Sequence, residues 1–393
     1  MKHAQHWLLE PGIDFLNHGS FGACPRPVLE LQTELRARLE REPVRFFVRE
    51  LEGLLDAARE ELGRFVGAAA ADLAFVPNAT AGVNTVLRSL ALQPGDELLT
   101  TDHSYRACRN ALEATAERAG ARVIVAQVPF PVRSPDEIVS AVLARRSSRT
   151  RLALLDHVTS PTAVVFPIAP LVAELAASGV DTLVDGAHAP GMLDLSLRDI
   201  GAAYYTGNCH KWLCAPKSVA FLHVNESRQQ AVRPLSISHG ATAIREGRSR
   251  FLLEHDWQGT FDPTPALCIP AAIGFLGSLL DGGWPALRER NHALACSARA
   301  LLCSELGIAA PCPESMLGSM AAIVLPQPSS SRPAEPYALD PLQDALFLQH
   351  GIEVPVYPWP APPQRLLRIS AQLYNDAGQY QKLATTLRQM LAA

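Results

Sequence analysis

Two short segments place an acid, a lysine and two histidines in a pattern that suits chemistry on an aldehyde-bearing ring. Asp185 ends an apolar run and His188 follows three residues later, while His210 directly precedes Lys211. A lysine amine forms an imine with an aldehyde, and a carboxylate beside a pyridine nitrogen keeps that nitrogen protonated, which makes the ring an electron sink. The pattern therefore predicts a site for pyridoxal 5'-phosphate (PLP), with Lys211 forming the imine and Asp185 at the ring nitrogen.

The two histidines extend this interpretation, although each residue also suits an ordinary structural role. His188 is placed to reach the phenolic oxygen of the cofactor, and His210 to approach its phosphate. Taken singly, Asp185 also suits a turn cap, Lys211 a solvated surface position, and either histidine a hydrogen-bonded core position. The combination favours the cofactor site, because separate structural roles would have to coincide.

The segment Asn78-Ala79-Thr80-Ala81-Gly82 has the composition of a phosphate cradle. It separates an apolar run from a helical pattern that continues to Leu92. N–H groups at the start of a helix, together with the Thr80 hydroxyl, bind anions well. A plain N-cap by Asn78 or Thr80 is the structural alternative. Neither Walker-A nor GxGxxG spacing is present, which disfavours a nucleotide site.

Polar residues follow two further apolar runs. His103 lies just past one of them, and His157 and Ser160 follow the next. In an open α/β sheet, the carboxyl ends of the strands meet at one rim, where ligands bind. We expect His103 to stack on the cofactor ring and His157 and Ser160 to lie at the same rim. A simple turn at Asp102 and His103 is the alternative.

A substrate carboxylate would suit Arg368, whose guanidinium offers a bidentate fork. Arg368 alternates with apolar neighbours on a predicted strand, and the turn from Asn17 to Ser20 is placed to cover the same carboxylate. An exposed strand residue and an N-terminal loop are the alternatives.

Two other chemistries find little support in the sequence. Cys209 and its neighbours lack a second ligand pair at zinc spacing, so no metal site is predicted, and no GxSxG nucleophile elbow surrounds Ser20.

The elements that must position these residues form an α/β pattern. Short apolar or β-branched runs alternate with helical patterns, which argues for a mostly parallel sheet. The helices include one opened by a capping box at Ser134-Pro135-Asp136-Glu137 and one from Pro167 to Ser178, closed by Gly179. The predicted strands begin near Leu73, Glu97, Arg122, Leu152, Thr182 and Ser218.

Beyond residue 262 the pattern changes and predicts a second, smaller α+β domain. It contains two long helical stretches, Pro265 to Leu280 and Trp284 to Leu306, followed by strands near Met320, Glu353 and Leu366 and a terminal helix. We therefore assign residues 1–262 to an N-terminal segment and large cofactor domain, and residues 263–393 to a small C-terminal domain. Residues 326–341 are rich in proline and serine and predict an exposed loop.

Composition limits the partners and the compartment. The 393 residues carry a formal net charge of −4, so no global positive field attracts a phosphate backbone or an anionic membrane. We expect no nucleic-acid partner. The start lacks the apolar stretch of a secretory signal and no later segment reaches membrane-span length, which predicts a cytoplasmic protein. The eight scattered cysteines suit free thiols, most of them small core residues.

The ordered set of motifs resembles the isopenicillin N epimerase-like branch of the aminotransferase class V family. The likeness runs over nearly the whole chain, through LNHGSFGACPRPV, EPVRFFVREL, FVPNATAGVNTVLRSL, LTTDHSY, DHVTSPTAVVFPI, VDGAHAPG, YYTGNCHKWLCAPK, WQGTFDPTPAL and LLRISAQLYN. It implies PLP fold type I, with a seven-stranded mostly parallel mixed sheet between helices and a small α+β C-terminal domain.

The resemblance also implies roles for particular residues. Lys211 would form the imine, Asp185 would contact the ring nitrogen, and His103 would stack on the ring. The phosphate would be bound by Ala79, Thr80 and His210, with Gly259 and Thr260 reaching the phosphate of a neighbouring subunit in a homodimer. The substrate carboxylate would meet Asn17, Ser20 and Arg368, and Arg45 lies in a segment that also borders the site.

The reaction remains open between several outcomes that begin by removing a proton from Cα of an amino acid or small peptide amine. Epimerisation and C–S β-elimination are ranked ahead of transamination, and a PLP-binding regulatory protein without turnover is the alternative of another class. Epimerisation needs a second acid opposite Lys211, for which His18 and Tyr105 are candidates. Cysteine desulfurases carry a nucleophilic cysteine after the strand at Met320, and this chain has none there, so persulfide chemistry is disfavoured.

Overall fold

A computed structural model describes residues 3–327 and 339–392, so most of the predicted loop at 326–341 lies outside the described residues. The α/β prediction is confirmed by a seven-stranded mixed sheet in the order β2-β8-β7-β6-β5-β3-β4. All neighbouring pairs are parallel except those of β8, which runs antiparallel to β2 and β7. The strands are β2 Leu73–Val76, β3 Glu97–Thr101, β4 Arg122–Ala126, β5 Thr150–Asp156, β6 Asp181–Asp185, β7 Tyr204–Asn208 and β8 Ala220–Val224.

Six of these strands coincide with the predicted runs, but β7 does not. Its sequence Tyr-Tyr-Thr-Gly-Asn contains too few aliphatic residues to be recognised as a run, although all five residues are buried. The strand is buried because it lies between β6 and β8 in the middle of the sheet. Since β7 leads directly to Lys211, it is also the strand that brings the predicted lysine to the carboxyl edge of the sheet.

Helices cover both faces of this sheet. Side chains of successive strand residues point to opposite faces. On β6, Leu183 packs with a cluster that includes residues of α5 and α6, whereas Val184 packs with a larger cluster that includes residues of α4, α7 and α8. The covering helices are α4 Leu51–Val66, α5 Ala79–Ser89, α6 Arg106–Ala119, α7 Pro135–Leu143, α8 Ile168–Ala176 and α11 Arg250–Asp256.

The helix starts show how local sequence fixes these positions. Asn78 caps α5, because its side chain accepts a hydrogen bond from the Ala81 N–H. Helix α7 begins at Pro135 as predicted, but the capping box is wrong in detail. The Ser134 side chain makes no capping bond, and Glu137 accepts from the Arg133 N–H instead. The proline and the acidic first turn therefore suffice to start α7.

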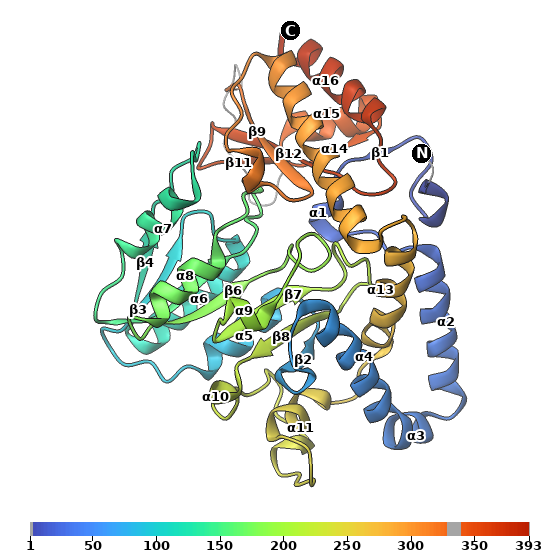
Figure 1. The fold of residues 1–393 in the computed structure, drawn as a ribbon, viewed down its shortest axis with the longest axis vertical. Helices are drawn as coiled ribbons and strands as arrows, with labels where there is room; N and C mark the ends of the chain where they lie inside the picture. The colour runs from blue at the N-terminus through green and yellow to red at the C-terminus, as the bar shows by residue number, and fades with distance from the viewer. Residues whose placement is uncertain (1–2, 328–338, 393) are drawn as a thin grey trace.

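The C-terminal elements form a separate three-stranded antiparallel sheet, β11-β12-β9, beside long helices (Figure 1). The predicted stretch Pro265 to Leu280 is two helices, interrupted at Cys268, whereas α14 matches its prediction closely. The elements are α12 Thr264–Leu267, α13 Ile269–Ser278, α14 Gly283–Leu306, β9 Met320–Leu325, α15 Pro341–His350, β10 Ile352–Glu353, β11 Val356–Pro358, β12 Arg365–Ser370 and α16 Ala377–Ala392.

The N-terminal segment links the two parts of the chain. Strand β1 Asp14–Phe15 pairs in parallel with β10, and α13 packs against α2 and α4. The boundary at residues 262 and 263 stays a prediction. The remaining helices are α1 His18–Phe21, α2 Arg26–Arg41, α3 Pro43–Arg45, α9 Leu197–Ile200 and α10 Glu226–Gln229.

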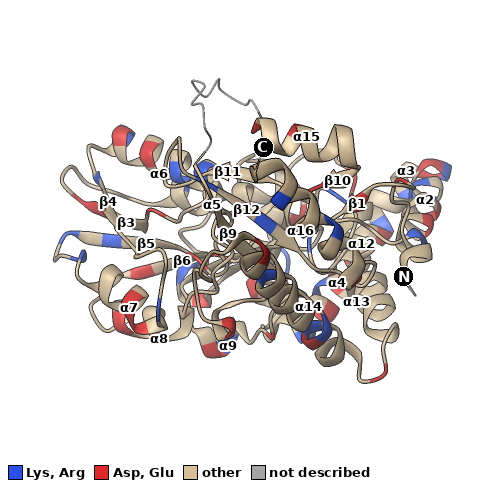
Figure 2. Ribbon diagram, turned by 90° about the horizontal axis from the view of Figure 1, so that it is seen from above, with Lys and Arg blue, Asp and Glu red and all other residues tan. Residues whose placement is uncertain are grey.

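The surface carries charges of both signs interspersed over the outer helices, such as α2 and α14 (Figure 2). Within residues 3–327 and 339–392, no single helix has the length and apolarity of a bilayer span. One bent pair, Thr264–Ser278 with Gly283–Leu306, meets that test only jointly, with an angle of 71° between its helices. The same residues contain no cluster of His, Cys, Asp and Glu arranged to hold a metal ion.

Candidate active site

A cavity of about 300 Å³ lies where the carboxyl ends of β5, β6 and β7 meet the start of α5. This is the edge at which an open α/β sheet binds ligands. The cavity brings together eight of the residues predicted from the sequence. They are Ser20, Ala79, Thr80, Ser160, Asp185, His188, His210 and Lys211.

The Lys211 amine lies 3.1 Å from His188 Nε2. Burial and, after it, the Arg368 charge lower the pKa of Lys211 to about 7, while Asp185 opposes the shift. The Trp212 indole N–H donates to His188 Nδ1 at 3.4 Å, and burial holds the pKa of His188 well below its usual value. A neutral imidazole that accepts at Nδ1 carries its proton on Nε2, so it donates to the lone pair of a neutral Lys211 amine.

Asp185 ends β6 and is 3% exposed. One of its oxygens accepts the Ala187 N–H at 3.0 Å, and the other accepts the Cys108 thiol at 3.0 Å. Both donors favour the charged form of a carboxylate. The cysteines are buried, as the prediction of core residues requires. The prediction did not foresee that the Cys108 thiol donates a hydrogen bond to Asp185. The thiol reaches the carboxylate because Cys108 lies in the first turn of α6.

Asp156 is a second carboxyl at the cavity and was not predicted as a site residue. It ends β5 in register with Asp185 on β6, lines the cavity and is 2% exposed. Its Oδ2 accepts the Tyr105 N–H at 3.1 Å. Burial raises the pKa of Asp156 well above its usual value, and the charge of Asp185 raises it further. The available signal was an acid at a strand end, the same signal that identified Asp185.

The start of α5 forms the end of the cavity suited to an anion. Thr80 lines it as predicted, but the Ala79 N–H already donates to Asn208 Oδ1 at 2.8 Å. His210 Nδ1 lies 3.0 Å from the Val219 carbonyl, and burial lowers the pKa of His210 to about 4. Lys217, which sequence reasoning missed, also lines this cavity, so it supplies the cation that a neutral His210 lacks.

The predicted carboxylate-binding residues contact one another, but of these only Ser20 lines the cavity, while Arg368 and Asn17 lie behind Ser20 and Ser160. Arg368 on β12 is 1% exposed, and it donates to the Ser160 carbonyl at 2.7 Å and to Ser20 Oγ at 3.1 Å. Ser20 in turn donates to Asn17 Oδ1. The guanidinium also lies 5.1 Å from the centre of the Tyr357 ring. The C-terminal sheet thus places its arginine against Ser20 and Ser160, two residues that line the cavity.

Two predicted histidines are buried behind the cavity and are not among its lining residues. His103 Nδ1 lies 2.8 Å from Thr162 Oγ1, and its ring packs edge-on against Trp359 at 4.7 Å between centres. His157 Nδ1 lies 2.8 Å from the Tyr205 hydroxyl. Burial lowers the pKa of each histidine to about 4, so both are neutral near pH 7.

Three further predicted residues do not line the cavity of the chain. Arg45 is exposed on α3 and pairs with Glu50 at 3.2 Å. Gly259 and Thr260 follow α11 and are absent from the cavity wall. Contacts from these residues to a cofactor remain predictions.

Comparisons with known proteins agree with this arrangement. The sequence profile of the family described as aminotransferase class-V matches residues 29–302. Isopenicillin N epimerase of Streptomyces clavuligerus is 37% identical over 392 residues, covering 97% of this chain and 95% of the relative. A probable chloroplastic L-cysteine desulfhydrase of Arabidopsis thaliana is 34% identical, covering 95% of this chain and 82% of the relative.

Solved structures show the same fold. A C-DES mutant with glycine covalently linked to its PLP cofactor superposes with a TM-score of 0.77 at 20% identity, covering 96% of this chain and 97% of that one. The fold-type-I prediction is therefore confirmed.

Proposed function

The chain belongs to the aminotransferase class-V family, and we propose that it is a PLP-dependent enzyme that acts at Cα or Cβ of an amino acid or a small peptide amine. The observation that carries this proposal is the Lys211 amine, held 3.1 Å from a neutral His188 in the same cavity as the Asp185 carboxylate. An uncharged lysine amine and a buried carboxylate are the two groups that PLP chemistry requires.

The residues present fit the cofactor. A cavity of about 300 Å³ lies at the lower end of the range for small-molecule sites. Lys211 would bond the aldehyde, Asp185 would accept from the ring nitrogen, and His188 would serve the phenolic oxygen. Thr80 at the start of α5 and Lys217 supply an N–H, a hydroxyl and a charge for the phosphate.

The chain's own groups divide the chemistry between them. When bound, PLP supplies an electron sink for the electrons released at Cα. Lys211 Nζ takes the proton from Cα, which its pKa of about 7 allows near neutral pH. Asp185 would hold the proton at the ring nitrogen of the bound cofactor, and Arg368 would orient the substrate through its carboxylate. The Ser20 and Ser160 hydroxyls lie beside that guanidinium and would complete the carboxylate site.

Epimerisation needs a second acid, and of the two candidates His18 and Tyr105 the cavity is lined by Tyr105, which we propose for this role. His18 is fully buried, with Nε2 3.0 Å from the Lys211 carbonyl and Nδ1 2.7 Å from the Tyr374 hydroxyl, and burial lowers its pKa to about 3. Tyr105 lines the cavity and follows β3, whereas Lys211 follows β7. Strands β5 and β6, which carry Asp156 and Asp185, lie between them, so the two groups approach from opposite sides.

The test is to incubate the PLP-loaded protein with candidate amino acids in heavy water. We expect deuterium at Cα with at least one of them, together with either the D-isomer or pyruvate. Keto acid formed stoichiometrically with aminated cofactor would favour the class V aminotransferase alternative. A protein that binds PLP and amino acids without any Cα exchange would instead be the regulatory module. Failure of Lys211 to form an imine with PLP would contradict the proposal outright.

A homodimer is part of the same proposal. Gly259 and Thr260 follow α11 and do not line the cavity of their own chain, which leaves them available to a neighbouring copy. Phe21 at the cavity wall is 73% exposed and Phe261 is 41% exposed, which suits surfaces covered by a partner. Sedimentation equilibrium should give twice the chain mass, and Thr260→Val should weaken PLP binding without changing that mass.

The proposal also places the protein in the cytoplasm. The eight buried free thiols suit its reducing conditions.

A further inference from the structure

The cavity contains two carboxyl groups where the chemistry of the site needs one carboxylate. Asp156 and Asp185 occupy neighbouring register positions at the ends of the parallel strands β5 and β6. They are 2% and 3% exposed. Two carboxylates this close in a site of low dielectric constant do not both ionise near neutral pH, because each charge opposes the other. One of the two must therefore be protonated.

The hydrogen-bond donors decide which carboxyl keeps the charge. Both oxygens of Asp185 accept a bond, one from the Ala187 N–H and one from the Cys108 thiol. Only Oδ2 of Asp156 accepts a bond, from the Tyr105 N–H, and its buried Oδ1 has no hydrogen-bond partner within residues 3–327 and 339–392. Donors stabilise the ionised form, so the charge resides on Asp185. Since Oδ2 accepts, the proton on Asp156 resides on Oδ1.

Around Asp156, burial and the Asp185 charge raise its pKa, and they outweigh the opposing effects of Tyr105, Ser104 and Lys211. Asp185 faces it from β6, Cys108 from α6, Lys211 from the segment after β7, and Tyr105 and Ser104 from the turn before α6. The single cation among them, Lys211, attracts the carboxyl more weakly than Asp185 repels it. Burial gives the largest shift and raises the pKa of Asp156 well above its usual value.

We propose that Asp156 is a protonated positioning residue, which anchors the backbone of Tyr105 at the cavity and leaves Asp185 as the one carboxylate that faces Lys211. This inference rests on the proposed function, because it assigns Asp156 a part in the same site. Neutrality matters because a second carboxylate would raise the pKa of Lys211 by attraction to its ammonium form. The Lys211 amine would then be protonated, and it would lose both its reactivity toward the aldehyde and its capacity to accept a proton.

The first test compares the same substitution on two neighbouring strands of the PLP-loaded enzyme. Asp156→Asn is uncharged and keeps an oxygen that accepts from Tyr105, so we expect PLP affinity and the pH midpoint of the imine absorbance to stay within about twofold of wild type. Asp185→Asn removes the charge at the ring nitrogen and should weaken PLP binding more than about tenfold. Asp156→Ala, which loses the anchor for Tyr105, should fall between them. An Asp156→Asn protein as impaired as Asp185→Asn would overturn the proposal.

The second test detects the proton without relying on cofactor or turnover. Infrared difference spectra of the full-length protein, wild type minus Asp156→Asn, should show the C=O stretch of a protonated carboxylic acid at pH 7. The difference between wild type and Asp185→Asn should lack that band. If the first difference shows carboxylate bands instead, Asp156 is ionised and the inference is wrong. Because this result does not depend on PLP, it separates a failure of the inference from a failure of the proposed function.

Discussion

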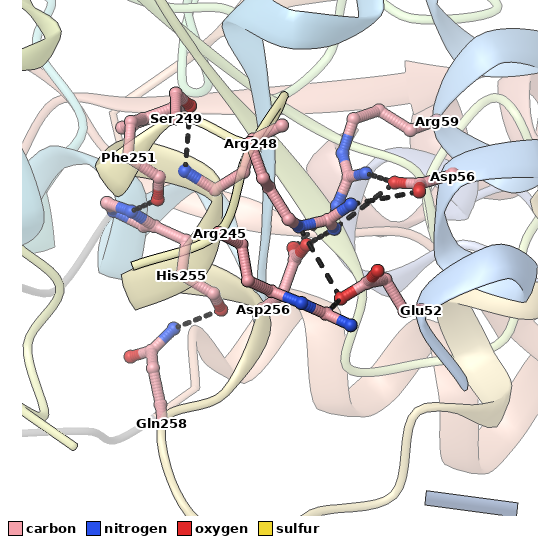
Figure 3. A network of polar contacts seen from close by, with 11 residues as sticks. Glu52, Asp56, Arg59, Arg245, Arg248, Ser249, Phe251, His255, Asp256 and Gln258 are labelled. Carbon is pink, nitrogen blue, oxygen red and sulfur yellow. Dashed lines mark hydrogen bonds and ion pairs between the residues drawn. The ribbon is translucent and has the colours of Figure 1, made fainter. Parts of the chain in front are cut away.

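Two regions of the molecule contain buried charged side chains and treat them in opposite ways, although in one of them Glu52, Asp56 and Arg245 stay partly exposed. The α4–α11 ion network consists of Glu52, Asp56, Arg59, Arg245, Arg248 and Asp256, and Figure 3 shows its guanidinium groups directed at the carboxylates. Arg59 bridges Asp56 and Asp256, and Arg248 contacts the same two acids. In the active-site cavity, by contrast, the Lys211 amine meets a neutral imidazole, and Asp185 accepts from an amide and a thiol.

The contrast teaches that burial alone does not decide what a charged group does. Burial disfavours both cations, but the hydrogen bonds that Arg248 donates to Asp56 and its attraction to Asp256 hold the pKa of Arg248 above its usual value. For Lys211 the attraction of Asp185 does not offset burial and the Arg368 charge, which together lower its pKa to about 7. A paired buried charge joins elements of the fold, whereas an unpaired one becomes reactive.

The largest expected effect is a loss of activity without a loss of stability when the active-site lysine is removed. Lys211→Ala should abolish the imine absorbance and lower Cα–H exchange at least about 10³-fold, because it removes both the amine and the base. The free energy of unfolding should hardly fall, since no ion pair is broken. Exchange assays measure the loss of Cα–H exchange, and urea titrations of the same protein measure the free energy of unfolding. Residual exchange near the wild-type rate would show that another group removes the proton.

The second prediction reverses this outcome. Arg59→Ala leaves Asp56 and Asp256 short of a partner and should lower the free energy of unfolding by about 3–5 kcal/mol, with the imine absorbance of the folded protein unchanged. Screening is weak at the pair of Arg59 with Asp256, which are 2% and 11% exposed, whereas Asp56 is 39% exposed and both acids keep Arg248, so the loss should lie at the lower end of this range. Arg64→Ala on the same helix is the matched control, because its pair with Glu61 is exposed and should contribute less than about 0.5 kcal/mol. Equal losses for both variants would contradict the comparison.

Local sequence signals identified most of the active-site cavity and none of the α4–α11 ion network. The strand-end acid at Asp185, the lysine after it and the polar start of α5 are all close to a recognisable run, so the cavity wall was predictable. Asp156 is also an acid at a strand end, but the sequence interpretation chose the neighbouring His157 as the site residue. In the structure the His157 imidazole is buried against Tyr205. The chemical role of a residue at a strand end depends on the face of the sheet to which its side chain points. An apolar run in the sequence does not specify that face.

The ion network could not be predicted because its partners are far apart in sequence. Asp56 on α4 meets Arg248, which precedes α11, across nearly 200 positions. Nothing in either segment alone specifies the other, since arginines and acids occur on many exposed helix faces. The same holds for Cys108, whose thiol reaches Asp185 only because α6 returns beneath the carboxyl edge of β6. Tertiary packing, rather than local pattern, decides which polar groups are paired.

A pH experiment sharpens the comparison at Lys211 itself. The rate at which the full-length apoprotein forms an imine with pyridoxal should follow the neutral amine, rising with pH and reaching half its maximum near pH 7 instead of near the 10.5 of an ordinary lysine. Asp185 opposes the lowering of this pKa, so Asp185→Asn should move the midpoint to lower pH. A midpoint that rises in the variant would mean that Asp185 does not act on Lys211 through its charge.

The smallest effect concerns the neutral donor to Asp185. Cys108→Ala removes the thiol hydrogen bond from a buried carboxylate and should reduce PLP affinity about fivefold, since a thiol is a weak donor even to a charged acceptor. Cys108→Ser keeps a donor of similar size and should restore at least half of that loss. Packing alone would make the two variants equally impaired, because both lose the sulfur. Rescue by serine would therefore show that Asp185 depends on neutral donors, where the carboxylates of the α4–α11 ion network depend on guanidinium groups.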